Sequence, residues 1–549
     1  MMIENLISNK TYLPRLKTDE LFELPMGSFD YSGEYDRAVR FVMEHQSKNT
    51  MLWKTFVDEF KNPVDATDGG WRGEFWGKMM RGAAWIYKYT KNEELYAILE
   101  ESVRDLLTAE DADGRFSTYV KENEFTYWDM WCRKYVLLGM QYFYDICPDE
   151  DLKASIISAL TRHLDYIISH IGDGEGQIDI LEATTHNNAT WGALNSSSIL
   201  EPTVRLYNLT GEKRYIDFAA YLVKRGGSKW GNVYKLALEG EKKPYEYPVK
   251  KAYELISYFE GVLEYYRVTG DEDAKRAFLN LVDGIIETDL TLIGCSGSYH
   301  ELLDHSSIMQ TEYTAQVKQE TCVTVTLMKA CYQALGLTGE AKYADVIELA
   351  GYNAMLGSIN FNKNTSIATD TGTEEYQRYV AANPFMKLIG GFTFDSYAPL
   401  YKDKRNRLNG GFKYMNGKAY GCCACIGGAG VALMPISSVL ASRDGIRLNQ
   451  FMNGKVTVGG LGIEIKTEYP YGERVDVKIT ESSGVELSVG IRVPEYAKGV
   501  MTVNGDIAKP DAQGYCVFTK AWQVGDEISI VIPRNAKLVD LVHILPTGL

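Results

Sequence analysis

Five stretches of the chain share one pattern of apolar and polar positions: an apolar helix, a tight turn and then an amphipathic helix. They read AAWIYKYTKNEELYAILEESV, GMQYFYDICPDEDLKASIISAL, TVRLYNLTGEKRYIDFAAYL, GVLEYYRVTGDEDAKRAFLNLV and ACYQALGLTGEAKYADVIELA. Their turns centre on Thr90, Pro148, Thr210, Thr269 and Thr338, so neighbouring turns lie 58, 62, 59 and 69 residues apart. The pattern predicts one helical hairpin about every sixty residues.

The two helices of each unit differ in where their polar positions fall. The first helix is apolar on nearly all sides, as in KKAYELISYFEGVLEYYRV, whereas the second has charged residues along one face. We therefore expect an inner layer of first helices and an outer layer of second helices. A weaker hairpin near residues 34–60 brings the number of units to six, the number that closes a double-layered α/α barrel. We predict this barrel for residues 1–440, and an open solenoid is the alternative.

From about residue 446 the pattern changes to short alternating runs, which are typical of strands. The runs are KVTVGG, IEIKTEY, RVDVKIT, VELSVGIRV and ISIVIP, and Asn504-Gly505 is a hairpin turn signal. They predict a β-sandwich domain over residues 441–549. The expected fold class is therefore mainly α, an (α/α)6 barrel followed by a C-terminal β-sandwich.

Charge and composition narrow the range of partners. The chain of 549 residues has 58 basic and 73 acidic side chains, a net charge of −15, and no basic run, so we expect no nucleic-acid partner. The N-terminus lacks a signal-peptide pattern and no stretch of about 18 apolar residues occurs, so we expect a cytoplasmic protein without a membrane partner. The sequence does not determine the oligomeric state, and a homo-oligomer is one of the possible states.

The nine cysteines are distributed too unevenly for a disulfide framework. Cys422 and Cys423 are adjacent, and Glu320 and Cys322 form a Glu-x-Cys motif about a hundred residues earlier. Three thiolates and one carboxylate would complete a four-coordinate site, and sulfur ligands favour zinc over calcium or magnesium. Cys425 offers a different third sulfur, and buried reduced cysteines without a metal are the alternative interpretation.

If the inner helices all run in one direction, their N-terminal ends and the loops before them gather at one mouth of the barrel. The polar and aromatic residues of these segments are Trp71, Arg72, Glu74, Trp128, Asp129, His186, Asn187, Asn188, Ser196, Lys251, Tyr253, Glu254, Glu301, His305, Glu320 and Cys322. A pocket of aromatic, carboxylate and amide groups suits a carbohydrate substrate. Helix capping is an equally good interpretation of Ser196 and Asp129.

Several stretches together resemble glycoside hydrolase family 127, the β-L-arabinofuranosidase-like proteins. These are KQETCVTVTLMKACYQALGLTG, YGCCACIGGAGVALMP, SSSILEPTVRLYNLTGEKRYIDFA and the terminal β pattern. The resemblance implies a six-hairpin barrel with β-sandwich domains and a retaining exo-glycosidase that acts on a plant-type or bacterial oligosaccharide or glycoside. It also implies zinc bound by Glu320, Cys322, Cys422 and Cys423, with Cys422 as the nucleophile.

The resemblance implies further roles. The general acid and base is Glu301, since the family has a glutamate shortly before the Glu-x-Cys motif; the spacing of 320 − 301 = 19 residues is slightly long, and Asp304 fits a shorter one. Tyr397 resembles a tyrosine that supports the nucleophile or contacts the sugar, although a core tyrosine is an equal alternative. The substrate-binding set that we predict is Trp71, Trp128, His186, Lys251, Tyr253 and Tyr397.

The chain also departs from the family pattern. It has only seven histidines, Lys251 stands where a histidine is expected, and Arg133 and Lys134 occupy another such segment. A more cationic pocket would accept an acidic sugar. Related chains continue beyond the position of Leu549, so the sequence does not tell whether a further C-terminal domain belongs to this protein. The alternative functions are another sugar-active barrel enzyme, an epimerase or uronyl hydrolase, and a non-catalytic sugar-binding protein with structural zinc.

Overall fold

The structure is a computed structural model that describes residues 19–184, 192–298, 301–311, 319–359, 361, 413–415 and 418–536. Six helices form the inner layer of the barrel: α5 (Glu74–Thr90), α7 (Asp129–Tyr144), α10 (Leu200–Thr210), α13 (Ala252–Thr269), α16 (Thr321–Thr338) and α21 (Cys422–Ser438). The outer layer contains α3 (Glu34–Val42), α4 (Thr50–Lys61), α6 (Glu93–Leu107), α8 (Glu150–His170), α11 (Lys213–Lys224), α14 (Glu272–Thr288) and α17 (Lys342–Ala350).

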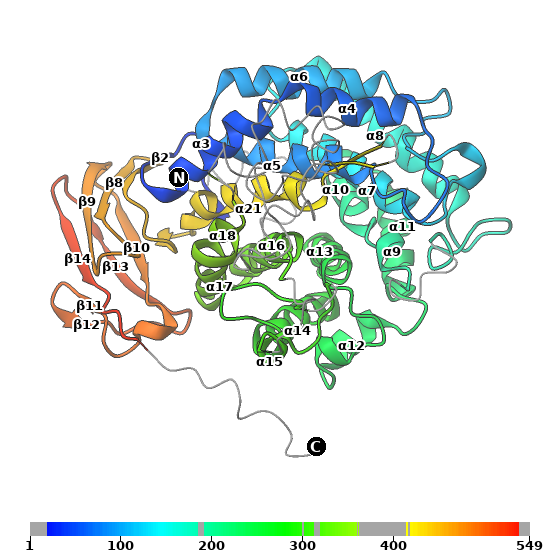
Figure 1. Ribbon diagram of the computed structural model, residues 1–549. Coiled ribbons are helices and arrows are strands. Elements are labelled where there is room, and N and C mark those ends of the chain that lie inside the picture. The colour runs from blue at the N-terminus through cyan, green and yellow to red at the C-terminus, as the bar shows by residue number, and fades with distance from the viewer. Residues whose placement is uncertain are drawn as a thin grey trace, which may run out of the picture.

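The inner helices form a closed ring. Each packs against the next in the order α5, α7, α10, α13, α16 and α21, and α21 returns to α5. Figure 1 shows α21, in yellow, between the blue α5 and the green α16, although α5 and α21 are far apart in the chain. The five predicted hairpins and their inner and outer layers are confirmed, and the closed ring excludes the open solenoid.

The sixth unit differs from the one that the sequence predicts. Residues 34–61 form α3, the π-helical turn η1 (Met43–Ser47) and α4 rather than an inner and outer pair. The sixth inner helix is α21, whose small residues allow close packing against α5. A Cβ atom at Gly82 of α5 would lie only 2.8 Å from the backbone nitrogen of Ala429 of α21. This close approach joins the two ends of the helical region.

Shorter elements connect the main helices. They are α9 (Leu194–Ser197), α12 (Val233–Glu239), α15 (Ser306–Met309), α18 (Leu356–Ser358), the π-helical turn η4 (Gly351–Met355) and the 3-10 turns η2 (Lys121–Asn123), η3 (Pro244–Glu246) and η6 (Glu495–Ala497). A small hairpin, β3 (Lys413–Met415) and β4 (Lys418–Tyr420), leads directly into α21. No helix within the described ranges combines the length and the apolar character needed to cross a lipid bilayer.

Two sheets make up the β-sandwich beside the barrel (Figure 1). Five strands pair in the order β1 (Phe22–Glu23), β5 (Val439–Ala441), β6 (Gly445–Leu448), β10 (Glu486–Arg492) and β13 (Tyr515–Ala521). Seven pair in the order β12 (Asp506–Ile507), β11 (Thr502–Val503), β14 (Glu527–Val531), β9 (Arg474–Ser482), β8 (Leu461–Thr467), β7 (Gly454–Val458) and β2 (Phe29–Tyr31). Asn504 and Gly505 form the turn between β11 and β12, both with positive φ, as the hairpin signal predicts.

The N-terminal strands β1 and β2 join sheets that otherwise come from the C-terminal region. Sequence patterns do not reveal them, because two or three residues are too few to show an alternation. They also cross the predicted boundary between domains, so the division into residues 1–440 and 441–549 stays a proposal. Buried Arg492 of β10 forms ion pairs with Asp345 and Glu348 of α17 and so links the sandwich to the barrel.

Candidate metal centre and active site

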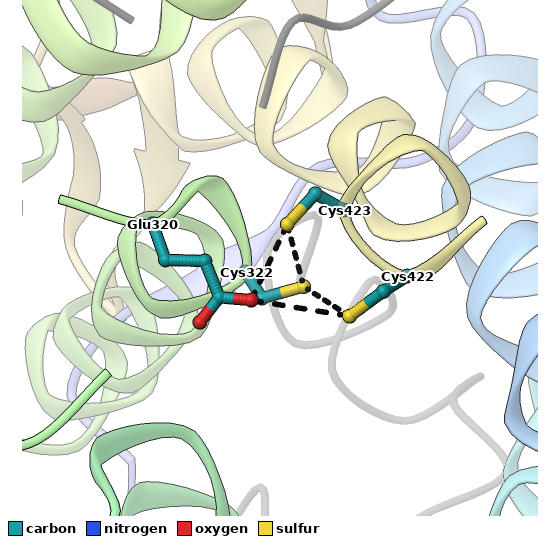
Figure 2. A group of neighbouring side chains, drawn as sticks. All are labelled: Glu320, Cys322, Cys422 and Cys423. Carbon is teal, nitrogen blue, oxygen red and sulfur yellow. Dashed lines mark hydrogen bonds between the residues drawn. The ribbon is translucent and has the colours of Figure 1, made fainter. Parts of the chain in front are cut away.

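Four side chains from two helix N-termini converge at one end of the inner ring. Glu320 immediately precedes α16, Cys322 lies in its first turn, and Cys422 and Cys423 begin α21. The Cys322 sulfur lies 3.3 Å from each of the Cys422 and Cys423 sulfurs, and the Cys423 sulfur lies 3.3 Å from Oε1 of Glu320. Figure 2 shows the four side chains pointing toward one another.

The sulfur atoms of the adjacent residues Cys422 and Cys423 can both contact one metal ion because the two residues begin helix α21. Successive residues of an α-helix are rotated by about 100°, and at the first turn no earlier turn blocks the space beyond the helix end. Cys425 lies one turn further along α21, is buried, and is not part of the group of four. The structure therefore selects the adjacent pair, not Cys425, to join Glu320 and Cys322.

The surroundings of the cluster favour a negative charge on one sulfur, that of Cys422, whereas burial raises the pKa values of Cys322 and Cys423. The sulfur separations of 3.3 Å are too long for a disulfide, and the cysteines are free. Hydrogen bonds from the thiols of Cys322 and Cys423 hold the pKa of Cys422 well below its ordinary value. The positive ends of two helix dipoles act in the same direction. Burial raises the pKa of Glu320 to about 7, and the negative charge of Cys422 adds to this rise.

The donor set fits a tetrahedral zinc ion. The four donor atoms all lie within 4.8 Å of one another. Zinc–sulfur bonds of about 2.3 Å place sulfur atoms about 3.8 Å apart in a tetrahedron, slightly more than the separations of 3.3 Å here. Oε2 of Glu320 is buried and has no hydrogen-bond partner among the described residues. Three sulfurs with one carboxylate match the ligand preference of zinc rather than that of calcium or magnesium.

A buried ion pair lies beside Cys422. The Lys78 ammonium of α5 is 2.9 Å from Oε1 of Glu74 and 3.9 Å from the Cys422 sulfur. It also lies over the ring of Tyr253, 4.4 Å from the ring centre. Burial alone lowers the pKa of Lys78, but the negative charges of Cys422 and Glu74 outweigh it and hold this pKa well above its ordinary value. Lys78 is therefore a fixed positive charge next to the exposed side of the cluster.

Glu301 meets Lys251 in an ion pair at the same mouth of the barrel. A short β-bridge between Lys251 and Leu302, with a 2.9 Å bond from the Ala252 amide to the Glu301 carbonyl, fixes this loop to the start of α13. Glu301 has a φ of 63°, in the left-handed region that is costly for a non-glycine residue. The loop geometry therefore directs the Glu301 carboxyl toward Lys251.

Asp304, the alternative acid and base, is engaged by neighbouring serines. Its carboxyl accepts hydrogen bonds from the Ser298 hydroxyl at 2.8 Å and from the Ser306 hydroxyl at 2.5 Å. Its backbone neighbour His305 stacks on Tyr245 and donates its amide to Asp289. These contacts assign Asp304 a role in holding the loop together.

The predicted aromatic residues lie at different depths. Trp71 is half-buried and packs against Tyr420, two residues before Cys422. Trp128 is buried and donates its indole N–H to Asp68 at 3.1 Å. Tyr253 is buried, and its hydroxyl is hydrogen-bonded to that of Tyr135. Trp71 is therefore the one of these three rings with a partly exposed surface beside the cysteines.

Other predicted residues have structural contacts or lie outside the described ranges. The Ser196 hydroxyl donates to the carbonyl of Ile180, and Asp129 accepts from the amide of Phe125 and pairs with Arg133. Neither side chain caps its helix, so the structure does not support the alternative interpretation of these two residues as helix caps. His186, Asn187, Asn188 and Tyr397 lie outside the described residues.

Lys78 lies near the cluster but is not among the site residues that were predicted from the sequence. Its signal is present in the sequence, because Glu74 and Lys78 stand four residues apart in EFWGKMMRGAAW, a segment with few other charges. An opposite pair at this spacing inside an otherwise apolar helix must be buried together. Trp131, whose indole donates to Glu74, belongs to the same group.

Two protein-family models match the chain. The model of the GH127 catalytic domain of β-L-arabinofuranosidases matches residues 29–384, and the model of the GH127 middle domain matches residues 445–534. The first match alone covers more than half of the chain. The chain belongs to the GH127 β-L-arabinofuranosidase family. This family membership identifies it as a glycoside hydrolase with a carbohydrate substrate.

One curated protein is similar to this chain over most of the chain's length. It is the non-reducing end β-L-arabinofuranosidase of Bifidobacterium longum subsp. longum, which is 22% identical over 520 residues, covering 84% of this chain and 70% of the relative.

Solved GH127 structures show the same fold. A β-arabinofuranosidase aligns with a TM-score of 0.69 and 17% identity, covering 94% of this chain and 81% of the other. A β-L-arabinofuranosidase of Geobacillus stearothermophilus T6 aligns with a TM-score of 0.66 and 18% identity, covering 94% and 83%. The barrel and the β-sandwich are therefore those of the family.

Proposed function

We propose that this chain is a retaining exo-glycosidase that removes a β-L-arabinofuranosyl residue from the non-reducing end of an oligosaccharide or glycoside. The observation that supports this proposal is the convergence of Glu320, Cys322, Cys422 and Cys423 at the mouth of the barrel. These four residues would hold zinc, which keeps its cysteine ligands as thiolates at neutral pH.

Cys422 is the best placed of the three sulfurs to act as the nucleophile. Cys322 and Cys423 are buried, whereas Cys422 is partly exposed. The Lys78 ammonium lies 3.9 Å from the Cys422 sulfur and favours its negative form. A sulfur that is charged and also accessible can approach a sugar that enters from the mouth of the barrel.

The reaction that we propose has two displacements at the anomeric carbon. In the first, the Cys422 sulfur forms a bond to this carbon while the bond to the leaving oxygen breaks, and Glu301 gives its proton to that oxygen. In the second, water attacks the same carbon, the carbon–sulfur bond breaks, and Glu301 takes the proton of the water. Two inversions at one carbon retain its configuration.

The charges around the site favour a neutral sugar. Three cations of the described part of this region lie beside carboxylates: Lys78 beside Glu74, Lys251 beside Glu301, and Arg133 beside Asp129. The buried Lys134 ammonium group has no hydrogen-bond partner among the described residues, and burial lowers its pKa to about 7, which weakens its positive charge at neutral pH. An acidic sugar would need a cation that is not already neutralised. The pocket is therefore less cationic than the sequence alone predicts, which supports a neutral arabinofuranosyl group.

Metal analysis together with covalent trapping tests the proposal. We expect about one zinc ion per chain, and a β-L-arabinofuranosyl compound with a cysteine-directed electrophile should label Cys422, as seen by peptide mass spectrometry. Cys516 is the matched control, since it is also partly exposed but lies in the β-sandwich. Chains without zinc, or label on Cys516 in place of Cys422, would contradict the proposal.

The products separate the alternative functions. Release of free arabinose from an aryl β-L-arabinofuranoside supports the glycosidase. An isomerised sugar in place of hydrolysis would indicate an epimerase, and hydrolysis restricted to unsaturated uronides would indicate a uronyl hydrolase. Sugar binding without any turnover would indicate a non-catalytic protein with structural zinc.

A further inference from the structure

A groove of about 510 Å³ lies between the start of the helical region and the turn that joins β8 to β9. Its apolar wall consists of Tyr35, Tyr352, Met452, Tyr469, Pro470 and Tyr471, and we call it the tyrosine groove. It shares no residue with the cysteine cluster. Its volume is in the range of sites that bind small molecules.

The rings of the tyrosine groove are held in place by their contacts. Tyr352 packs edge-on against Tyr35, with ring centres 5.4 Å apart, and against Tyr469, with ring centres 6.2 Å apart. The Tyr469 hydroxyl donates to Glu348 at 2.6 Å. Tyr471 differs from the others, because 69% of its surface is exposed. The groove therefore offers a pre-arranged aromatic wall with an accessible ring at its edge.

Polar groups line the remainder of the groove. Glu34 and Arg37 form an exposed ion pair, and the Asn453 amide donates to the Ser32 hydroxyl at 2.8 Å. Tyr35 is only 2% exposed, and its hydroxyl has no hydrogen-bond partner among the described residues. The Tyr35 ring therefore forms part of the wall of the groove, while its buried hydroxyl lies in the interior.

We propose that the tyrosine groove is a second carbohydrate-binding site, separate from the catalytic mouth, and that it holds a neutral oligosaccharide. The C–H faces of sugars pack against aromatic rings, and sugar hydroxyls bond to carboxylate, guanidinium and amide groups such as those of Glu34, Arg37 and Asn453. The groove binds substrate chains while their ends are cleaved elsewhere.

The choice of a sugar over a peptide rests on the proposed function. Aromatic grooves also bind proline-rich peptides. Planar hydrogen-bonding groups beside the rings suit the many hydroxyls of a sugar, and the family acts on carbohydrates. The groove is mixed in charge, because its lining includes one arginine, Arg37, and two glutamates, Glu34 and Glu468, which does not suit a polyanion.

Affinity electrophoresis in gels containing a soluble arabinan with β-L-arabinofuranosyl linkages tests this site. The Cys422→Ser chain is used, so that binding is measured without turnover. We expect arabinan to retard this chain, and Tyr471→Ala in the same background to weaken binding about tenfold through loss of a stacking ring. Tyr471→Phe keeps the ring and should bind within about twofold of the parent.

Two controls make the result decisive. Val485→Ala removes another exposed apolar side chain of the sandwich, 59% exposed and outside the groove, and should leave binding unchanged. Equal retardation of the parent and of Tyr471→Ala would show that arabinan binds at the mouth alone and would overturn the proposal. Lack of retardation, or Tyr471-dependent binding of a proline-rich peptide without arabinan binding, would overturn it too. Since turnover is not measured, failure of the proposed catalytic function leaves this test intact.

Discussion

Two buried polar clusters inside the same barrel differ in how their charges are combined. In the middle of the ring, the Lys329 ammonium of α16 lies 2.8 Å from a carboxylate oxygen of Glu201 and 2.8 Å from one of Glu260. Two turns nearer the helix N-terminus, three thiols and the Glu320 carboxyl lie together. The first cluster pairs opposite charges, and the second gathers groups that are all anionic when deprotonated.

This difference in charge pairing distinguishes a cluster that stabilises the fold from one that can bind a ligand. Burying a charge is costly unless an opposite charge compensates for it, and Lys329 with its two glutamates meets that condition within the protein. In the cluster of Glu320, Cys322, Cys422 and Cys423, the nearby positive charges of Lys78 and Lys251 meet this condition in part. Four groups that all become anionic when they lose a proton suit a bound cation, and this supports our proposal of a metal at the second cluster, whereas the first cluster already has its cation in Lys329.

The largest expected effect is that of Cys422→Ser at the cysteine cluster. A serine hydroxyl is far less nucleophilic than a thiolate, so we expect kcat on an aryl β-L-arabinofuranoside to fall by about 10⁴-fold, while the melting temperature changes little. Cys425→Ser is the matched control on the same helix and should keep its zinc and most of its activity. An active Cys422→Ser enzyme would show that Cys422 is not the nucleophile, and the cysteine cluster would then have no catalytic role to set against the structural role of the Lys329 cluster.

Lys329→Met tests the middle cluster. The methionine fills a similar volume but leaves Glu260 buried without its paired cation and Glu201 with only the longer pair to Arg205, at 3.5 Å. We therefore expect a loss of about 3–5 kcal/mol in the free energy of unfolding. Denaturant unfolding measures this loss. Lys213→Met, which breaks the exposed pair with Asp217, should cost less than about 0.5 kcal/mol. Equal stability of these two variants would show that the middle cluster is not held by charge pairing.

Glu301→Gln tests a residue that has features of both clusters. Glu301 forms an ion pair with Lys251, as the glutamates of the Lys329 cluster do with their lysine, but we propose that it acts as the catalytic acid and base. Loss of its proton should slow cleavage of an alkyl glycoside about 10²- to 10³-fold. A p-nitrophenyl glycoside should be affected less, since its leaving group needs little protonation. Asp304→Asn, in the same loop, should show no such dependence on the leaving group. An equal loss on both substrates would assign Glu301 a positioning role.

Local sequence patterns determined five helical hairpins and five strands of the sandwich, β7, β8, β9, β10 and β14. Each hairpin is specified by a run of apolar positions, a turn and an amphipathic run within about forty residues, so its signal lies inside one segment. The Glu-x-Cys and Cys-Cys motifs also identified the four candidate ligands. The sequence motif therefore predicted which residues converge, although it left Cys425 as an alternative.

Only the tertiary structure decided how distant segments meet. It closed the ring through Gly82 of α5 and Ala429 of α21, added β1 and β2 to the sheets, and showed that Asp304 is engaged by Ser298 and Ser306. It also placed Lys78 beside Cys422, 344 residues away in the chain. A periodic pattern reports which face of one element is buried, but the partner of that face is set by packing between elements, which no local pattern records.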